Sequence, residues 1–193
     1  SDVNEIMDAP IFGFGLYNPN KNILEFKGMV EYGELLPSYE FSISDNESLG
    51  AMCFNNGMDI VINDFDVDVF KYLESYDRTN IPGEPPESLV YLPLVFKGEK
   101  IGVITAQSYR KGKYRDKNIF TLKVLANYVA IAAHNANLYE TSEEQVDISQ
   151  TNYNLVKRQV ELGIMAGADL YEAESLLFSD KLALTQNQNR LKA

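Results

Sequence analysis

The amino-acid sequence predicts an α+β fold, with an antiparallel sheet flanked by helices and an α-helical hairpin at the C-terminal end. Two apolar runs, Leu89–Leu94 and Ile101–Thr105, enclose a charged turn that contains glycine, which is typical of a β-hairpin. A helical pattern then covers about Asp116–Tyr139. The pattern changes after this helix, so we expect two segments, residues 1–140 and residues 141–193.

The composition fits a packed globular protein and excludes several classes of partner. Of the 193 residues, 45% are hydrophobic, which is enough for a buried core. The formal net charge of -11 disfavours binding to nucleic acid or to an anionic membrane surface. No apolar run approaches the roughly 18 to 20 residues that span a bilayer, and no signal peptide is visible at the start. We therefore expect a cytoplasmic protein with no nucleic acid partner and no membrane insertion.

The first part of the chain is predicted to form a pair of strands. Val3–Ala9 has the pattern of a helix end, and Pro10 separates it from a strand over Ile11–Tyr17. The turn formers of Asn18–Asn22 lead into a partner strand within Ile23–Tyr32. Alternation along this partner directs three apolar side chains inward: Leu24, Phe26 and Met29.

A short helix should follow these strands. Ser44 and Glu47 have the spacing of a capping box, in which each residue satisfies a free backbone N–H group of the other. The helix should run to about Asn55, with Gly57 as its C-terminal stop.

A buried strand and another helix come next. Asp59–Ile62 is predicted to be the strand, and the helix should cover Val67–Tyr76. Three carboxylates suit the positive end of this helix: Asp64, Asp66 and Asp68. The proline-rich stretch Thr79–Ser88 should be an irregular loop that leads into the central hairpin.

The C-terminal quarter is predicted to be helical with one break. Glu143–Val160 is polar and helical, and Leu162–Gly167 interrupts it. Asp169 can cap a second helix. Leucines recur every seven residues along that helix, at Leu170, Leu177, Leu184 and Leu191. These features predict a helical hairpin whose arms carry apolar seams.

The order of these elements resembles a GAF domain over residues 2–140. The likeness lies in the apolar hairpin before a long helix, the stretch Glu47–Asp64, the polar Tyr114–Asp116 and the ending Ala132–Tyr139. The resemblance implies a GAF-like sensory or regulatory domain of a bacterial signalling protein, which binds and relays without chemistry. It also implies a small-molecule ligand and a downstream signalling domain, and the apolar seams of the C-terminal helices predict a homodimer. The sequence does not identify the ligand or any cofactor.

The resemblance also places a ligand pocket between the sheet and the short helices. Aromatic side chains would form its apolar wall, and Asp64 could accept a hydrogen bond from a ligand. By position, the candidate ligand-binding residues are Phe41, Phe54, Asp64, Phe70, Tyr72 and Tyr91. The alternative is that these residues fill the core and that the domain serves only in dimerisation.

The stretch Tyr153–Ala193 resembles the periplasmic helical hairpin of outer-membrane efflux proteins of the TolC type. The likeness lies in Arg158–Gly163, in Asp169–Glu174 and in the Gln- and Asn-rich leucine helix that follows. Two interpretations remain open. The chain is a fusion or assembly fragment with an efflux-type tail, for which a periplasmic location fits, or a signalling helix resembles that hairpin by chance.

The sequence contains no set of residues that indicates catalysis or a resident metal. Cys53 is the only cysteine and lacks the adjacent histidine of a bilin attachment pair, so we expect it to be structural. His134 is the only histidine, which leaves no histidine pair for a metal. Asp64–Asp68 imitates the start of a calcium loop, but Val69 and Ser75 replace the glycine and glutamate that such a loop requires. A methionine-sulfoxide reductase is disfavoured because that chemistry depends on reactive cysteines.

Overall fold

The computed structural model describes residues 9–45, 47–74 and 84–192, and the chain divides into two units, residues 1–131 and residues 132–193. This division and the predicted one after residue 140 both fall inside helix α4 (Asp116–Glu161). The predicted helix end at Val3–Ala9 lies outside the described residues, apart from Ala9 itself.

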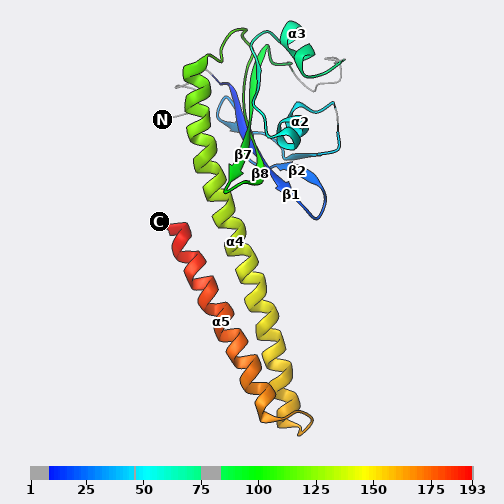
Figure 1. The fold of residues 1–193 in the computed structure, drawn as a ribbon, viewed down its shortest axis with the longest axis vertical. Coiled ribbons are helices and arrows are strands. Elements are labelled where there is room, and N and C mark those ends of the chain that lie inside the picture. Colours follow the sequence, from blue (N-terminus) through cyan, green and yellow to red (C-terminus); the bar gives the residue numbers. More distant parts are fainter. Residues whose placement is uncertain (1–8, 46, 75–83, 193) are drawn as a thin grey trace. The chain divides into compact units, whose positions relative to one another are not determined.

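One antiparallel sheet forms the centre of residues 9–131 (Figure 1). Among the described residues its strands are β1 (Ile11–Asn18), β2 (Ile23–Phe26), β3 (Val30–Glu31), β4 (Glu34–Leu35), β5 (Tyr39–Ser42), β6 (Ile60–Ile62), β7 (Ser88–Phe96) and β8 (Glu99–Ser108). Their order in the sheet is β4-β3-β1-β8-β7-β6, with β2 paired to β1 and β5 paired to β2. The predicted antiparallel α+β fold is confirmed.

The predicted central hairpin is confirmed as β7 and β8, but both strands are longer than expected. They extend to Phe96 and from Glu99, so the turn consists of Lys97 and Gly98 instead of Val95–Lys100. Both turn residues have positive φ angles, 51° and 85°. Two residues with positive φ make the tight turn whose twist matches that of paired strands, and the ladder can therefore continue to the turn.

Side chains on the two faces of this hairpin enter two separate cores. On one face, Val90, Leu92 and Ile104 pack with apolar residues of the first part of α4. On the other face, Leu89 and Val103 pack with the short helices and with the inner side of β2. Because both faces are covered, the strands are apolar at nearly every position. The prediction that Leu24, Phe26 and Met29 point inward is confirmed, since each is at most 3% exposed.

The first short helix, α2 (Leu49–Asn56), begins later than the sequence predicted. Ser48 is its N-cap, and its hydroxyl oxygen accepts a hydrogen bond from the N–H of Ala51 at 3.2 Å. The predicted capping box at Ser44 is wrong, because Asp45 closes a local turn instead by accepting from the N–H of Glu47. The predicted stop at Gly57 is confirmed by its left-handed backbone and its bond to the carbonyl of Cys53.

The second short helix is also displaced from its prediction. It consists of α3 (Phe65–Asp68) and a 3-10 turn, η1 (Val69–Lys71), whereas Val67–Tyr76 was expected. The side chain of Asp68 turns back and accepts from the backbone N–H groups of Asn63 and Asp64, at 2.9 and 3.0 Å. These bonds fix the start of α3 two residues earlier. Acidic side chains do serve this positive helix end, as predicted.

The remaining two helices are α4 and α5 (Gly167–Lys192). The two helices predicted over Asp116–Tyr139 and Glu143–Val160 are one, because neither glycine nor proline occurs between Asp116 and Glu161. The break before α5 is confirmed, and the Asp169 carboxylate accepts from the N–H of Ala166 at 3.0 Å.

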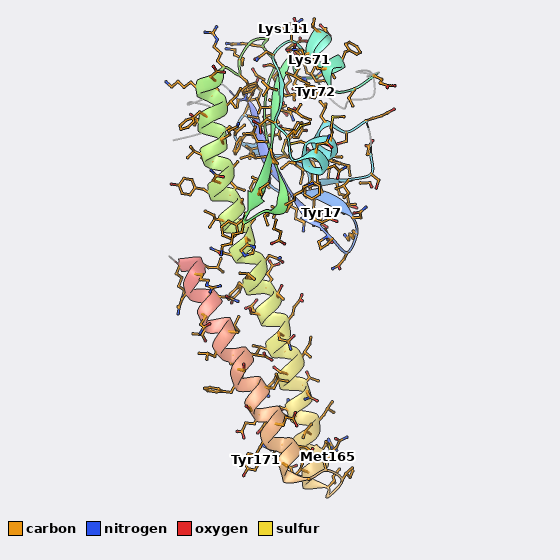
Figure 2. All side chains as sticks on the ribbon, in the orientation of Figure 1. Tyr17, Lys71, Tyr72, Lys111, Met165 and Tyr171 are labelled. Carbon is orange, nitrogen blue, oxygen red and sulfur yellow. The ribbon has the colours of Figure 1, made fainter. Side chains whose placement is uncertain are left out.

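Within residues 132–193, α4 and α5 form the predicted helical pair. Its interior includes the buried side chains Val156, Ala173 and Leu177. The Asn187 amide donates to the Ser142 hydroxyl at 2.7 Å, which adds a polar contact between the helices. Figure 2 labels Met165 in the connection and Tyr171 near the start of α5. None of the helices in the described part of the chain has both the length and the apolar character that a membrane crossing requires.

The close approach of β1 and β8 gives a test of this arrangement. A methyl group on Gly102 would lie 2.0 Å from the carbonyl oxygen of Gly15, which is backbone and cannot rotate away. We expect Gly102→Ala to lower the free energy of unfolding by about 3 kcal/mol, because β8 must separate from β1. Gly28→Ala is the matched control, since its new methyl group makes ordinary contact with Phe14 at 3.7 Å. Urea denaturation followed by circular dichroism compares the two variants, and equal stabilities would contradict the strand register.

Candidate functional site

A pocket of about 210 Å³ opens on one face of the sheet. This is the face that α2 and α3 cover (Figure 1). The pocket lies where the start of α2 meets β7, β8 and the start of α3. Its lining residues are Glu47, Ser48, Leu49, Gly50, Phe65, Pro86, Leu89, Tyr91 and Gln107.

The pocket has an apolar floor and a polar rim. Leu49, Phe65 and Leu89 are each at most 6% exposed and form the apolar part. Gln107 adds a carboxamide whose nitrogen donates to the hydroxyl of Thr105 at 3.3 Å. Among the described lining residues, Glu47 is the only one with a charged side chain, and it is exposed. Such a site can hold a small ring and orient it through a few hydrogen bonds.

A glycine allows the helix to approach the pocket wall. A methyl group on Gly50 would lie 2.7 Å from the ring of Phe41 and 3.4 Å from the ring of Tyr91. Without a side chain at this position, α2 packs directly on the two aromatic rings. Two of the six predicted ligand-binding residues therefore meet at α2: Tyr91 lines the pocket, and Phe41 supports it from β5.

Phe54 and Phe70, two more of these predicted residues, have different surroundings. Phe54 is only 5% exposed and lies inside the core, with its ring centroid 4.7 Å from that of Tyr17. Phe70 is 58% exposed on η1 and is not among the lining residues. Neither side chain borders the pocket.

Tyr72 serves the edge of the sheet. Its hydroxyl accepts from the N–H of Val61 at 3.2 Å and donates to the carbonyl of the same residue at 3.4 Å. β6 pairs with β7 on one side, so this phenol satisfies backbone groups on the other side. An edge protected in this way is closed to another strand.

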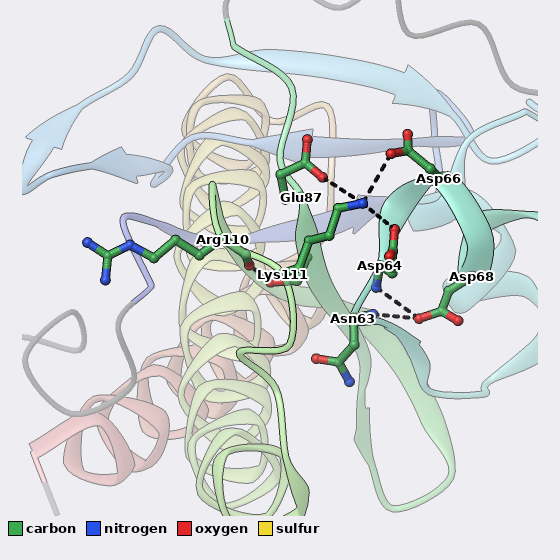
Figure 3. Close-up of polar contacts among 8 residues, drawn as sticks. Asn63, Asp64, Asp66, Asp68, Glu87, Arg110 and Lys111 are labelled. Atoms are coloured by element: carbon green, nitrogen blue, oxygen red, sulfur yellow. Dashed lines mark hydrogen bonds and ion pairs between the residues drawn. The ribbon is translucent and has the colours of Figure 1, made fainter.

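Asp64 belongs to a charged cluster next to the pocket. The ammonium of Lys111 lies 2.8 Å from Asp64, 3.2 Å from Asp66 and 3.7 Å from Glu87 (Figure 3). The hydrogen bond to Asp64 raises the pKa of Lys111, followed by the bond to Asp66. Lys111 and Tyr72 lie at the same end of the sheet, opposite Tyr17 (Figure 2). The carboxylate expected to meet a ligand is instead paired with a lysine.

Asn63 was not among the predicted site residues, although it makes several contacts beside the pocket. Its side-chain amide donates to the carbonyl of Tyr114 and accepts from the N–H of the same residue, both at 2.9 Å. Its backbone carbonyl accepts from the N–H of Gly112 at 2.8 Å. Asparagine after a strand commonly indicates a turn, so no local signal connects this residue with one 51 positions later.

The chemistry of Cys53 is that of a buried thiol. Its side chain is fully buried, and burial, followed by the nearby charge of Asp59, raises its pKa to about 12. The nucleophilic thiolate is therefore scarce at neutral pH. Among the described residues, no group of three or more His, Cys, Asp or Glu side chains could hold a metal ion.

Comparisons with known proteins agree on one fold. A family model described as "GAF domain" matches residues 1–134. A search of curated proteins gives no match. A sensor histidine kinase GAF domain from Bacillus halodurans is 14% identical, with a TM-score of 0.55, and the alignment covers 72% of this chain and 92% of that one.

Two further solved structures show the same likeness. Type II free methionine-R-sulfoxide reductase from Thermoplasma acidophilum has 20% identity and a TM-score of 0.54, and the match covers 68% of this chain and 84% of that one. The GAF domain of an Acinetobacter phosphoenolpyruvate-protein phosphotransferase has 10% identity and a TM-score of 0.53, over 70% and 77% of the two chains. At these identities the likeness is one of fold.

The carboxylate of Asp68 gives a pH-dependent test of the site. Its pKa is lowered from 3.8 to about 2, mainly by Lys71 and then by the N–H groups of Asp64 and Asn63. Because the folded pKa is depressed, the stabilisation is complete above the ordinary pKa and is lost as the pH falls toward 2. We expect Asp68→Asn to cost about 1–2 kcal/mol at pH 7 and the deficit to shrink between about pH 4 and pH 2.

The control for this prediction is Asp66→Asn. The Asp66 side chain is 56% exposed, so its pair with Lys111 should contribute little to the free energy of unfolding. Urea titrations at several pH values measure both variants. A deficit of Asp68→Asn that stays constant from pH 7 to pH 2 would contradict the assigned bonds.

Proposed function

The chain belongs to the GAF domain family, and we propose that it acts as a non-enzymatic sensory or regulatory domain of a bacterial signalling protein. The pocket beside α2 is the observation that carries this proposal, because it combines a buried apolar floor with a few polar groups. A bound small molecule would favour one arrangement of the domain, and α4 would relay that arrangement to a downstream signalling domain.

We place the ligand against Tyr91, with Phe41 behind the wall and Gln107 at the polar rim. Of the other predicted residues, Phe54 supports the core and Tyr72 supports the edge of β6. Asp64 would act on the ligand only indirectly, through Phe65, its neighbour in the chain and in the pocket wall. Phe70 has no assigned role.

The charge of the pocket restricts the ligand class. Glu47 is acidic, and the described lining residues include no lysine or arginine. A phosphate or carboxylate ligand would meet this carboxylate without a side-chain cation to neutralise it. We therefore propose a neutral or cationic ligand with a flat apolar part, and this charge disfavours cyclic nucleotides.

Homodimerisation is the second part of the proposal. Four apolar side chains lie exposed on the first part of α4, spaced three or four residues apart along one face: Phe120, Val124, Tyr128 and Ile131. Phe120 and Tyr128 are 69% and 68% exposed. A second copy presents the same stripe, and two such stripes can cover each other in a symmetric pair.

Catalysis is the least favoured alternative. A structural neighbour is a free methionine-R-sulfoxide reductase, but this chain has one cysteine, which is buried and has a raised pKa. Thiol chemistry would need that group to be accessible and ionised.

No observation on this chain favours the efflux-type tail over an accessory helical pair. The break between α4 and α5 at Gly163 is compatible with an efflux-type tail, because an uninterrupted helix would not form a hairpin. The same break is compatible with an accessory helical pair on a signalling protein. We therefore keep the sensory function as the proposal, with the helical pair as its extension.

Three probes that share one aromatic frame test the ligand class: phenethylamine, 2-phenylethanol and 3-phenylpropionate. We expect the ammonium and the alcohol to raise the melting temperature, and the carboxylate to bind about tenfold more weakly, because of Glu47. Glu47→Gln should reduce that difference, whereas Glu34→Gln, an exposed carboxylate on β4, should leave it unchanged. Equal or tighter binding of the carboxylate would contradict the ligand class. If none of the three shifts the melting temperature, the ligand role loses its support.

Light scattering tests the dimer. The full chain of 21.8 kDa should have twice that mass in solution. Tyr128→Glu should give the monomer, because it places a charge in the apolar stripe, whereas Asn20→Glu, in the exposed turn after β1, should remain dimeric. A monomeric wild-type chain at high concentration would refute this part of the proposal. If the full chain is a dimer and residues 1–140 alone are a monomer, the tail is the assembly device.

A further inference from the structure

The pocket wall is joined directly to the loop that precedes α4. Phe65 lines the pocket between Asp64 and Asp66, and Leu89 follows Ser88 in the chain. These three neighbours, Asp64, Asp66 and Ser88, all contact the loop of residues 109–115, which connects β8 to α4. Each of these wall residues is therefore only one position along the chain from a residue that contacts the loop.

Backbone hydrogen bonds tie three segments of the wall together. The N–H of Phe65 donates to the carbonyl of Glu87 at 3.0 Å, and the N–H of Glu87 donates to the carbonyl of Ser108 at 2.9 Å. The start of α3, the segment before β7 and the end of β8 are thus linked in one layer. The Ser88 hydroxyl, fully buried, extends this layer by donating to the carbonyl of Arg110 at 2.6 Å.

Asn63 connects this layer to the end of the loop. Its two side-chain bonds to Tyr114 act as a bidentate clasp, and its carbonyl holds Gly112. Tyr114 is 1% exposed and packs in the core under α4. The carbonyl of Arg115, the next residue, accepts from the N–H groups of Asn118 and Ile119 at 2.8 and 3.1 Å. The clasp thus lies one residue from the first hydrogen bonds of α4.

Two kinds of contact hold the loop, and they differ in strength. Lys111 pairs with three carboxylates, but its side chain is 47% exposed, so water and salt weaken these pairs (Figure 3). The bonds of Asn63 are partly buried and neutral, so salt does not screen them. The asparagine clasp should therefore carry most of the coupling, and Lys111 should add a smaller, salt-dependent part.

We propose that Asn63 couples the pocket to α4: occupancy displaces the wall at Phe65 and Leu89, and the Asn63–Tyr114 clasp passes the displacement to the first turns of α4. This inference rests on the proposed sensory function, because it concerns regulation by the same pocket. It assigns a positioning role to Asn63, which does not touch the pocket.

A covalent occupant makes the test independent of the unknown ligand. Gln107→Trp places an indole at the pocket rim, and the chain has no other tryptophan, so its fluorescence reports directly on the pocket. Hydrogen–deuterium exchange of the α4 amides at residues 118–125 is the readout. In the wild-type background we expect Gln107→Trp to change these exchange rates three- to tenfold.

The same substitution is then made in Asn63→Ala. There we expect Gln107→Trp to change the α4 rates less than twofold. Asn55→Ala is the matched control, because the Asn55 side chain also donates to a backbone carbonyl, that of Ile43, but does so away from the loop. In this control the full effect of the tryptophan should persist. Lys111→Met should reduce the effect only partly, and less so at high salt.

Two outcomes would overturn the proposal. One is an equal effect of Gln107→Trp on α4 with and without Asn63, and the other is no effect in the wild-type background although the indole fluorescence shows a buried ring. If Asn63→Ala does not fold, Asn63→Asp replaces it, since a carboxylate can accept from Tyr114 but cannot donate to it, and full coupling in that variant would also refute the proposal. If no small-molecule probe binds, the proposed ligand function fails, but the coupling measured with Gln107→Trp is unaffected, because that test uses no ligand.

Discussion

Everything in residues 9–131 depends on the pairing of β8 with both β1 and β7. In this three-stranded centre β1 lies so close to β8 that a methyl group on Gly102 would meet the carbonyl oxygen of Gly15, whereas a methyl group on Gly15 would meet the ring of Phe26 on β2. Once this centre has formed, alternation along the strands assigns each side chain to one of two cores. The pocket face receives the glycines of β1, Tyr91 and Gln107, whereas the α4 face receives Gly102 and mainly apolar side chains, such as Leu92 and Ile104. The alternation of side chains along the strands thus places the pocket on one face and the packing of α4 on the other.

The sequence predicted most of this fold because its strongest patterns are local. The central hairpin, the inward residues of β2 and the helical pair each follow from periodicity within one segment. The errors lie at helix starts, where a single side chain decides the outcome. The N-cap of α2 is Ser48 and not Ser44, because Asp45 accepts a hydrogen bond from Glu47 in a local turn. Helix α3 begins earlier than predicted because the Asp68 side chain accepts from the backbone N–H of Asn63. Several polar side chains near a helix start can form the capping hydrogen bond, and the hydrophobic periodicity does not show which of them does so.

The site was harder to predict than the fold, for a related reason. Position in the chain led to Tyr91 at the pocket, but it also selected Phe54 and Tyr72, whose side chains serve the core and a strand edge. An aromatic residue has the same sequence signature in each of these roles. Gln107 was missed because it is a polar residue near the end of an otherwise apolar strand and belongs to no motif of its own. Three nearby carboxylates do indicate that a cation is needed, yet nothing local points to Lys111, 47 residues from Asp64.

A polar connection at the end of an otherwise apolar sheet has a physical consequence for signalling. Apolar packing is weakly directional, so a core can absorb a small displacement by many slight adjustments. Hydrogen bonds depend steeply on angle and distance, and a bidentate pair such as Asn63 with Tyr114 is held in one geometry. A displacement at the pocket wall should therefore be absorbed by small adjustments in the two cores, whereas the Asn63–Tyr114 hydrogen bonds should transmit it to the loop before α4. Since α4 runs without glycine or proline from Asp116 to Glu161, a change at its first turn meets no sequence-encoded hinge along the helix.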